Sequence, residues 1–180
     1  MEHAFPCGNT SLDFVGTLRA RRNQEPTEML GSADSLDAWF RESGVSDTAP
    51  GASTADLDAA LTLREAIYTL VAGRIAGDDY QDDPLSIINE AAALPSPVTH
   101  LDHHGKHTQA TPAQALSAVA RDAIDILSRP ASDVLKECGR PECTQVYLDL
   151  SRGSRREWCA METCGNKMKA AAYRARKRAA

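Results

Sequence analysis

Hydrophobic residues recur at steps of three and four along much of this chain, which is the spacing of one face of an α-helix. The clearest pattern runs from about residue 55 to residue 76. Its expected buried face consists of Leu57, Ala60, Leu61, Arg64, Ile67, Tyr68, Val71 and Ile75. Gly77 and two aspartates follow directly, and because these residues disfavour helix, we expect the helix to end there.

Three shorter helices are predicted from the same spacing and from residues that cap helix ends. Asp34 is the expected N-cap of the first, and Gly44 stands where a C′ glycine belongs. The second begins with Asp83 as its cap and ends before Pro95. The third opens with the capping box TPAQ at residues 111–114. The expected buried positions are Leu36, Trp39, Phe40, Leu85, Ile88, Ala92, Leu116, Val119, Ala120, Ala123, Ile124 and Leu127.

The first residues of the chain fit two interpretations. Leu12, Val15 and Leu18 form one helical stripe after the capping candidates Thr10 and Ser11, whereas alternation around Leu12 also fits a strand. Cys7 is single and lies far from the other cysteines. We expect it to be a small buried apolar residue.

Residues 97–110 have a different pattern, in which β-favouring residues flank a D-H-H-G turn, and we predict a β-hairpin. This stretch holds four of the five histidines. A metal site of His103, His104 and His107 is conceivable, but neighbouring residues of a hairpin point to opposite faces and no cysteine or carboxylate pair completes the set. We therefore favour solvated turn residues.

The composition is that of an ordinary globular protein: 180 residues, 42% hydrophobic and 25% charged. The first residues lack the basic and apolar regions of a signal peptide, and no apolar window is long enough to span a bilayer. A cytoplasmic protein is expected. In that reducing compartment, paired cysteines are metal ligands more often than disulfides.

Four of the five cysteines are spaced as C-x4-C, fifteen residues, then C-x4-C, namely Cys138, Cys143, Cys159 and Cys164. Two pairs separated by a hairpin-sized segment are what one tetrahedral zinc ion needs. Four cysteine ligands leave no open position for water, and no nucleophile motif, carboxylate pair or phosphate loop is present. We expect one structural Zn²⁺ and no enzyme activity.

The segments around these cysteines predict a small zinc module. Gly and Pro lie between the first two ligands, which suits a tight knuckle. Residues 144–150 are expected to form a strand that pairs with residues 155–158, and Cys164 opens a helix. The predicted fold class is α+β: a mostly helical N-terminal domain, residues 1–130, with a small β-hairpin or sheet, then a treble-clef-like zinc finger, residues 131–180. Pro130, Ala131 and Ser132 form the expected joint.

Charge is unevenly distributed along the chain. Residues 136–180 carry 11 lysines and arginines against 5 acidic residues, and the remainder is strongly acidic, so that the net charge is −5. A basic end favours a polyanion partner such as nucleic acid, although docking on the acidic body stays open. In the last helix, basic residues border a stripe of Met168, Ala172, Ala175 and Ala179. The candidate nucleic-acid contacts are Arg152, Arg155, Arg156, Lys167, Lys169, Arg174, Arg176, Lys177 and Arg178.

The C-terminal motifs resemble the CGNR zinc-finger family, in which the finger follows an N-terminal domain called ABATE. The matching stretches are D-x-S-R at 149–152, Arg155-Arg156, WC-x-M at 158–161 and CGNK at 164–167. Residues 9–18 and 63–67 are similar to parts of the ABATE domain. The resemblance implies a bacterial, stress-induced transcription regulator whose four cysteines bind zinc and whose hairpin and last helix face DNA.

Three positions depart from the family pattern. Lys167 replaces the namesake arginine, which keeps the charge but loses the planar fork of donors. Gly16 replaces an expected asparagine, and Glu157 stands where a basic residue is more usual.

We expect a DNA-binding regulator whose N-terminal domain senses a small-molecule or protein effector, with no membrane association and with a homodimer as the plausible assembly. The alternative is a non-enzymatic protein-interaction module with a purely structural finger.

Overall fold

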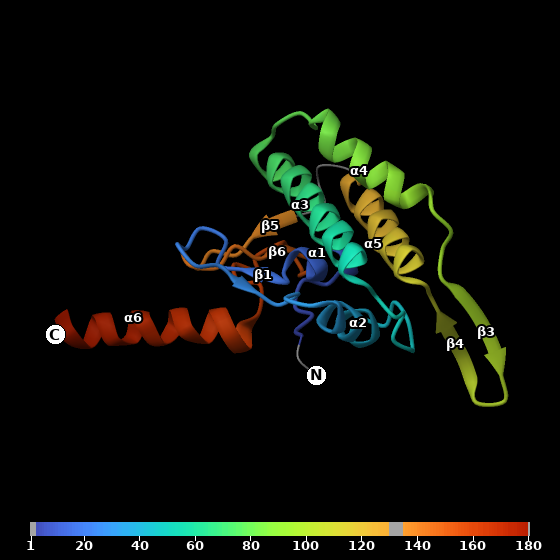
Figure 1. The fold of residues 1–180 in the computed structure, drawn as a ribbon. Helices are drawn as coiled ribbons and strands as arrows, with labels where there is room; N and C mark the ends of the chain where they lie inside the picture. Colours follow the sequence, from blue (N-terminus) through green and yellow to red (C-terminus); the bar gives the residue numbers. More distant parts are fainter. Residues whose placement is uncertain (1–2, 130–134, 180) are drawn as a thin grey trace.

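The computed structural model describes residues 3–129 and 135–179, and shows a helical body, a zinc-finger region against it, and two extended elements (Figure 1). The expected joint at residues 130–132 lies outside the described residues. The elements, in chain order, are α1 Thr10–Val15, β1 Leu18–Arg19, β2 Thr27–Glu28, α2 Ala33–Glu42, α3 Thr54–Ala76, α4 Asp82–Ala93, β3 Val98–Asp102, β4 Gly105–Gln109, α5 Pro112–Leu127, β5 Leu135–Glu137, β6 Val146–Leu148, the π-helical turn η1 Met161–Gly165, and α6 Asn166–Ala179.

Helices α3, α4 and α5 pack side by side and form the main layer of the body (Figure 1). The predicted capping box of α5 is confirmed, because Thr111 and Gln114 each bond to the other's backbone amide. None of the helices in the described part of the chain combines the length and apolarity needed to cross a membrane. The mostly helical α+β architecture is as the sequence predicts.

The buried face of α3 is wider than its periodicity predicts. Ala60, Ile67 and Val71 are buried as expected, but Leu63 and Leu70 are also buried. Ile75, expected inside, is 39% exposed. The reason is that α3 contacts α4 and α5 on one side and α1, α2 and β5 elsewhere, so that more than one face of this helix is covered.

Arg64 lies on the buried face of α3 with a carboxylate partner from β2. Its Nη1 and Nη2 donate to the two carboxylate oxygens of Glu28, at 2.6 and 2.7 Å. Burial alone would raise the pKa of Glu28, but the hydrogen bonds from Arg64 and from backbone amides lower it. A buried arginine needs such a bidentate partner, so this ion pair explains why a cation occupies a helix face that is otherwise apolar.

The start of the chain forms a helix, and the cap residues differ from those predicted. Asn9, rather than Thr10 or Ser11, caps α1, since its Oδ1 accepts from the amide of Leu12 at 3.1 Å. Leu18 follows in β1 rather than in the helix. Trp39 of α2 then packs against Phe14 of α1, with ring centroids 4.9 Å apart, so the two short helices share one aromatic cluster.

Two further N-caps each lie two residues before the predicted ones. Ser32, not Asp34, caps α2 in a capping box with Ser35, and Asp34 lies in the first turn, where a negative charge suits the helix dipole. Gln81, not Asp83, is the cap residue of α4. The glycine expected after α2 is confirmed, since Gly44 adopts a left-handed φ of +77°.

The predicted β-hairpin is confirmed as β3 and β4, which pair in the register Val98↔Gln109 to Asp102↔Gly105. It extends away from the helical body as an arm (Figure 1). All five residues of β3 are exposed.

The strand pairing predicted within the finger is wrong. Strand β6 pairs with β5, in the register Leu135↔Leu148 to Glu137↔Val146, and not with residues 155–158. Backbone groups of that segment are bonded elsewhere: the amide of Arg156 donates to Asp149 Oδ2 at 2.9 Å, and the amide of Gly139 donates to the carbonyl of Glu157 at 2.9 Å. The first cysteine knuckle therefore lies between the two paired strands.

The finger and the helical body share one continuous hydrophobic core. The amide of Leu148 donates to the Cys7 carbonyl, and Gln145 Nε2 donates to Cys7 Sγ, both at 3.0 Å. Arg22 pairs with both carboxylate oxygens of Glu137, at 2.6 and 2.8 Å. Cys7 is fully buried, as predicted, and it lies at the junction of the two regions.

Gly16 is needed where the finger approaches α1. A Cβ at this position would lie 1.7 Å from Gln145 Nε2, so Gly16→Ala should displace the amide and break its bond to Cys7. We expect Gly16→Ala to lower the free energy of unfolding by about 1–2 kcal/mol, measured by urea denaturation. Because Gln145→Ala makes room for the methyl group, the double variant should lose less stability than the sum of the two single variants. Additive losses would contradict this account.

Asp13 is buried beside Cys7, and burial raises its pKa to about 6. The folded state therefore holds a proton that the unfolded chain releases between about pH 4 and pH 6, so the stability should increase as the pH falls through that range. Asp13→Asn should remove this dependence. Between pH 7.5 and pH 5 we expect the wild type to gain on the order of 1 kcal/mol relative to Asp13→Asn, measured by paired urea denaturations. Parallel pH profiles of the two proteins would count against the assignment.

Candidate metal centre

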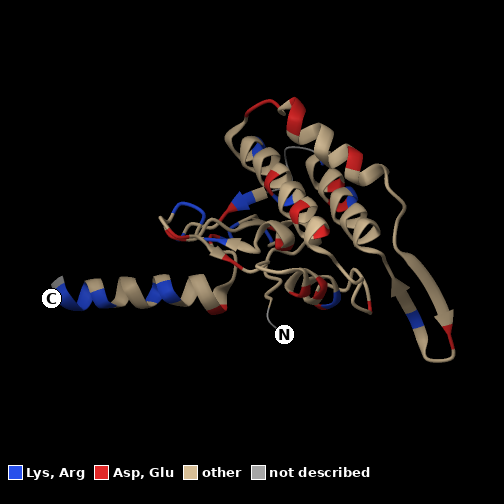
Figure 2. Ribbon diagram, in the orientation of Figure 1, with Lys and Arg blue, Asp and Glu red and all other residues tan. Residues whose placement is uncertain are grey.

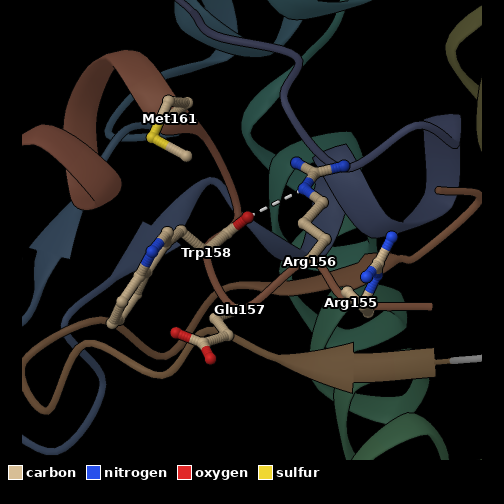
Figure 3. A pocket seen from close by; sticks show the side chains of 5 residues that line it. All are labelled: Arg155, Arg156, Glu157, Trp158 and Met161. Atoms are coloured by element: carbon tan, nitrogen blue, oxygen red, sulfur yellow. Dashed lines mark hydrogen bonds between the residues drawn. The ribbon is translucent and has the colours of Figure 1, made fainter. Parts of the chain in front are cut away.

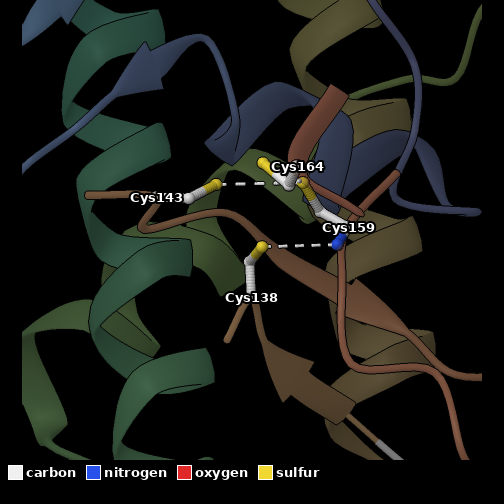
Figure 4. Close-up of side chains that lie close together, drawn as sticks. All are labelled: Cys138, Cys143, Cys159 and Cys164. Atoms are coloured by element: carbon white, nitrogen blue, oxygen red, sulfur yellow. Dashed lines mark hydrogen bonds between the residues drawn. The ribbon is translucent and has the colours of Figure 1, made fainter. Parts of the chain in front are cut away.

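Four short segments bring the four clustered cysteines together (Figure 4). Cys138 directly follows β5, and Cys143 lies at the end of a turn closed by its own amide, which donates to the Arg140 carbonyl at 2.8 Å. Cys159 lies in the loop before η1, and Cys164 lies within η1, immediately before α6. Three of the thiols are buried and Cys143 is half-buried.

The sulfur positions match a tetrahedral metal site. All four Sγ atoms lie within 4.8 Å of one another. Cys159 Sγ is 3.8 Å from Cys143 Sγ and 3.6 Å from Cys164 Sγ. Four sulfurs around one zinc ion, each at a bond length of about 2.3 Å, would be separated by about 3.8 Å. The cluster therefore has the dimensions of a Zn–S₄ centre.

Donors around the cluster favour thiolate sulfur. The amide of Cys159 donates to Cys138 Sγ at 3.4 Å, and Arg140 Nη1 lies 3.8 Å from Cys164 Sγ. A hydrogen bond from Cys159 lowers the pKa of Cys143, and the same bond raises the pKa of Cys159. Ionisation of one thiol thus makes ionisation of its neighbours less favourable when no cation lies among them. A bound dication would supply the positive charge that balances several thiolates.

The Trp158 side chain lies close to two glycines beside the cysteine cluster. A Cβ on Gly139 would lie 3.3 Å from Trp158 Cζ3, and a Cβ on Gly165 would lie 3.1 Å from Trp158 Cδ1. Both glycines directly follow a clustered cysteine, Cys138 or Cys164. The indole ring therefore lies against both knuckles at once.

Comparison with protein families agrees with this geometry. Residues 8–130 match the ABATE family, whose description reads "Putative stress-induced transcription regulator". The chain belongs to the ABATE family. Residues 135–177 of this ABATE protein match the CGNR zinc finger, so the resemblance read from the sequence is confirmed. A search of curated proteins gave no match.

A zinc-finger match and four converging cysteines support one structural zinc ion in this ABATE protein. The ion would join the end of β5 to the start of α6. In the part of the chain that the structure describes, this cluster is the only group of three or more potential ligand side chains that converges on one point. His103, His104 and His107 are not brought together in this way.

Asp149, within the D-x-S-R motif, organises the loop before Cys159. It accepts hydrogen bonds from Lys136 Nζ at 2.7 Å, from the amide and hydroxyl of Ser151, and from the amide of Arg156. Burial by itself raises the pKa of Asp149, but these donors lower it well below its ordinary value. These contacts were not predicted from the sequence, in which Asp149 and Ser151 stand out only as part of the D-x-S-R motif.

Arg156, predicted to contact nucleic acid, makes several contacts beside the metal centre. Its Nε donates to the Trp158 carbonyl at 2.7 Å, and its Nη2 donates to the carbonyls of Pro6 and Cys159. Its guanidinium also lies over the Tyr147 ring, 4.5 Å from the centroid. Figure 3 shows Arg156 on the wall of a cavity of about 210 Å³ that Arg155, Glu157, Trp158 and Met161 also line. These hydrogen bonds use Nε and Nη2, and contact of Arg156 with nucleic acid stays a prediction.

The other eight candidate cations are exposed. Their side chains make no hydrogen bond or ion pair with any residue that the structure describes. Two lie in the loop after β6 and six lie on α6: Arg152, Arg155, Lys167, Lys169, Arg174, Arg176, Lys177 and Arg178. Helix α6 projects from the body, and its main contact with another described element is with η1 (Figures 1 and 2). In this structure the basic helix therefore does not dock on the acidic body.

Removal of zinc should unfold more than the finger, because finger and body share a core. We expect one zinc per chain by elemental analysis, and chelation should decrease helical circular dichroism and expose Trp158 to solvent, seen as a red shift of fluorescence. Cys159→Ser should lose the zinc. Cys7→Ala is the matched control, since Cys7 lies outside the cluster, and it should retain one equivalent. Zinc retention by Cys159→Ser would rule out the assignment.

Proposed function

We propose that this chain is a DNA-binding transcription regulator in which Cys138, Cys143, Cys159 and Cys164 hold zinc and α6 contacts the phosphate backbone. The observation that carries the proposal is the exposure of six unpaired cations on one projecting helix (Figure 2). Unpaired lysines and arginines on an exposed helix are the electrostatic signature of a polyanion surface. The family description as a transcription regulator supports the same partner.

The arrangement of charge on α6 suits a DNA groove. At 100° per residue, Lys167, Arg174 and Arg178 share one side of the helix, and Lys169 and Arg176 share another. The small residues Ala172 and Ala175 are exposed between them. A helix with a narrow stripe of small residues can approach a groove closely while its flanking cations reach phosphates on both sides.

Zinc has a positioning role in this proposal. Cys164 lies two residues before Asn166, the first residue of α6, so the ion would fix the point from which the helix projects. Met168 is the one residue of α6 between Asn166 and Arg178 that is half-buried. We also propose that the finger has a treble-clef-like fold and that the two domains divide between residues 130 and 131.

The N-terminal domain would supply the regulatory input. We propose that it senses a small-molecule or protein effector, that the protein acts in the cytoplasm, and that it binds DNA as a homodimer, since a single short finger gives limited specificity. The shared core and the hydrogen bonds to Cys7 support transmission from the body to the finger.

A second candidate function is a protein-interaction module with a purely structural finger. The exposed Tyr173, 61% accessible on α6, favours it, because exposed aromatic residues are enriched in protein interfaces. In that case an acidic protein surface would replace the phosphates.

Titration onto duplex DNA at several salt concentrations, followed by fluorescence anisotropy, separates the two functions. The triple variant Arg174→Gln, Arg176→Gln, Arg178→Gln should bind at least about tenfold more weakly and reduce the slope of log affinity against log salt by up to about 3. The matched control is Arg19→Gln, Arg41→Gln, Lys106→Gln, which changes the net charge equally at exposed positions of the body.

The control variant should bind like the wild type, because its cations lie outside α6 and the finger loop. Equal weakening of both triple variants would mean that net charge alone drives binding. Undetectable or salt-insensitive binding by the wild type would reject DNA as the partner and leave the interaction module.

A further inference from the structure

The β3–β4 arm presents two histidines and an aspartate on one face. Strand pairing sets His100 directly opposite His107, and residues that are directly opposite in an antiparallel pair share a face of the sheet. Asp102 lies two residues after His100 on the same strand and therefore on the same face. Lys106 pairs with Leu101, so the only lysine of the hairpin lies on the other face.

The carboxylate of Asp102 is held in place by the turn. Its Oδ1 accepts from the amide of His104 at 2.7 Å and from the amide of Gly105 at 3.1 Å. Its Oδ2 lies 3.2 Å from His107 Nε2. One oxygen thus fixes the orientation, while the other is directed at an imidazole of the opposite strand.

These residues have no evident role in the packing of the arm. His100 and Asp102 are exposed, and the side chain of His107 is 44% accessible. Directly opposite side chains have Cβ atoms about 5 Å apart, a separation that one metal ion can bridge. Two imidazoles and one carboxylate form a common ligand set for divalent transition metals such as Zn²⁺ and Ni²⁺.

We propose that His100, Asp102 and His107 form a second metal site, which binds a divalent transition-metal ion independently of the cysteine cluster. The three side chains do not converge on one point in this structure. Rotation of the exposed His100 side chain about its own bonds brings its imidazole toward His107. Water molecules complete the coordination on the side of His100 and Asp102, which are exposed, whereas His107 Nε2 is covered and has no hydrogen-bond partner among the described residues.

The site differs from the triad that the sequence spacing first suggests. His103 and His104 lie in the turn between the strands, outside the paired register. The strand register therefore places His100, and not His103 or His104, opposite His107. Asp102 supplies the carboxylate.

Titration of Ni²⁺ into zinc-loaded protein without an affinity tag, followed by calorimetry, tests the site. We expect one bound Ni²⁺ per chain without release of zinc, which a colorimetric chelator reports. His100→Ala and His107→Ala should each weaken Ni²⁺ binding about tenfold or more. Asp102→Asn should also weaken it, while the amide oxygen can still accept the two turn hydrogen bonds.

His103→Ala is the matched control, since it removes a histidine from the same hairpin but not from the proposed face, and it should bind Ni²⁺ like the wild type. Thermal melts of all four variants should match that of the wild type, because the substituted side chains lie outside the core. Equal losses in His100→Ala and His103→Ala, absence of Ni²⁺ binding, or release of one zinc per bound Ni²⁺ would each overturn the proposal.

Discussion

The close approach of four thiols is the constraint on which the rest of the finger depends. Sulfurs less than 4 Å apart cannot all ionise without a cation, and three of the four cysteines are buried. A bound dication meets both requirements and at the same time fixes the end of β5, the turn to Cys143, the loop at Cys159 and the start of α6. Glycines stand next to Cys138 and Cys164, where a Cβ would crowd Trp158 and, at Gly165, would also overlap Met161 Sδ.

The metal centre is also connected to the helical body through a few buried polar groups. Arg156 bonds the carbonyl of Cys159 and that of Pro6, so one guanidinium joins a metal knuckle to the N-terminal segment. Gln145 reaches Cys7 from the other side, past Gly16. The two family matches end and begin at residues 130 and 135, but the core crosses that division. A shift of α1 would therefore reach the finger through direct contacts, without passing along the connecting segment.

Local signals in the sequence predicted much of the fold, and contacts between distant residues account for what was missed. Periodicity located the four main helices, because the buried face of a helix is set by residues close to one another in the sequence. The same is true of the capping box of α5. Periodicity failed for α3, where a second buried side containing Leu63 and Leu70 is created by other elements. It also failed for β6, whose partner lies before the knuckle because Asp149 binds the amide of Arg156. Cysteine spacing, together with the residues around it, predicted the metal centre, but the role of Arg156 depends on Pro6, 150 residues away.

Zinc and a polyanion would stabilise different parts of helix α6. It has 14 residues, and an isolated helix of this length is marginally stable in water. Arg174 and Arg178 are one turn apart, and their like charges repel each other, although the cations in the last turn suit the negative end of the helix dipole. Zinc at Cys164 can fix only the first turn, and no other described element covers the rest. In the proposed DNA complex, phosphates would remove the repulsion along the exposed side and so stabilise the helix.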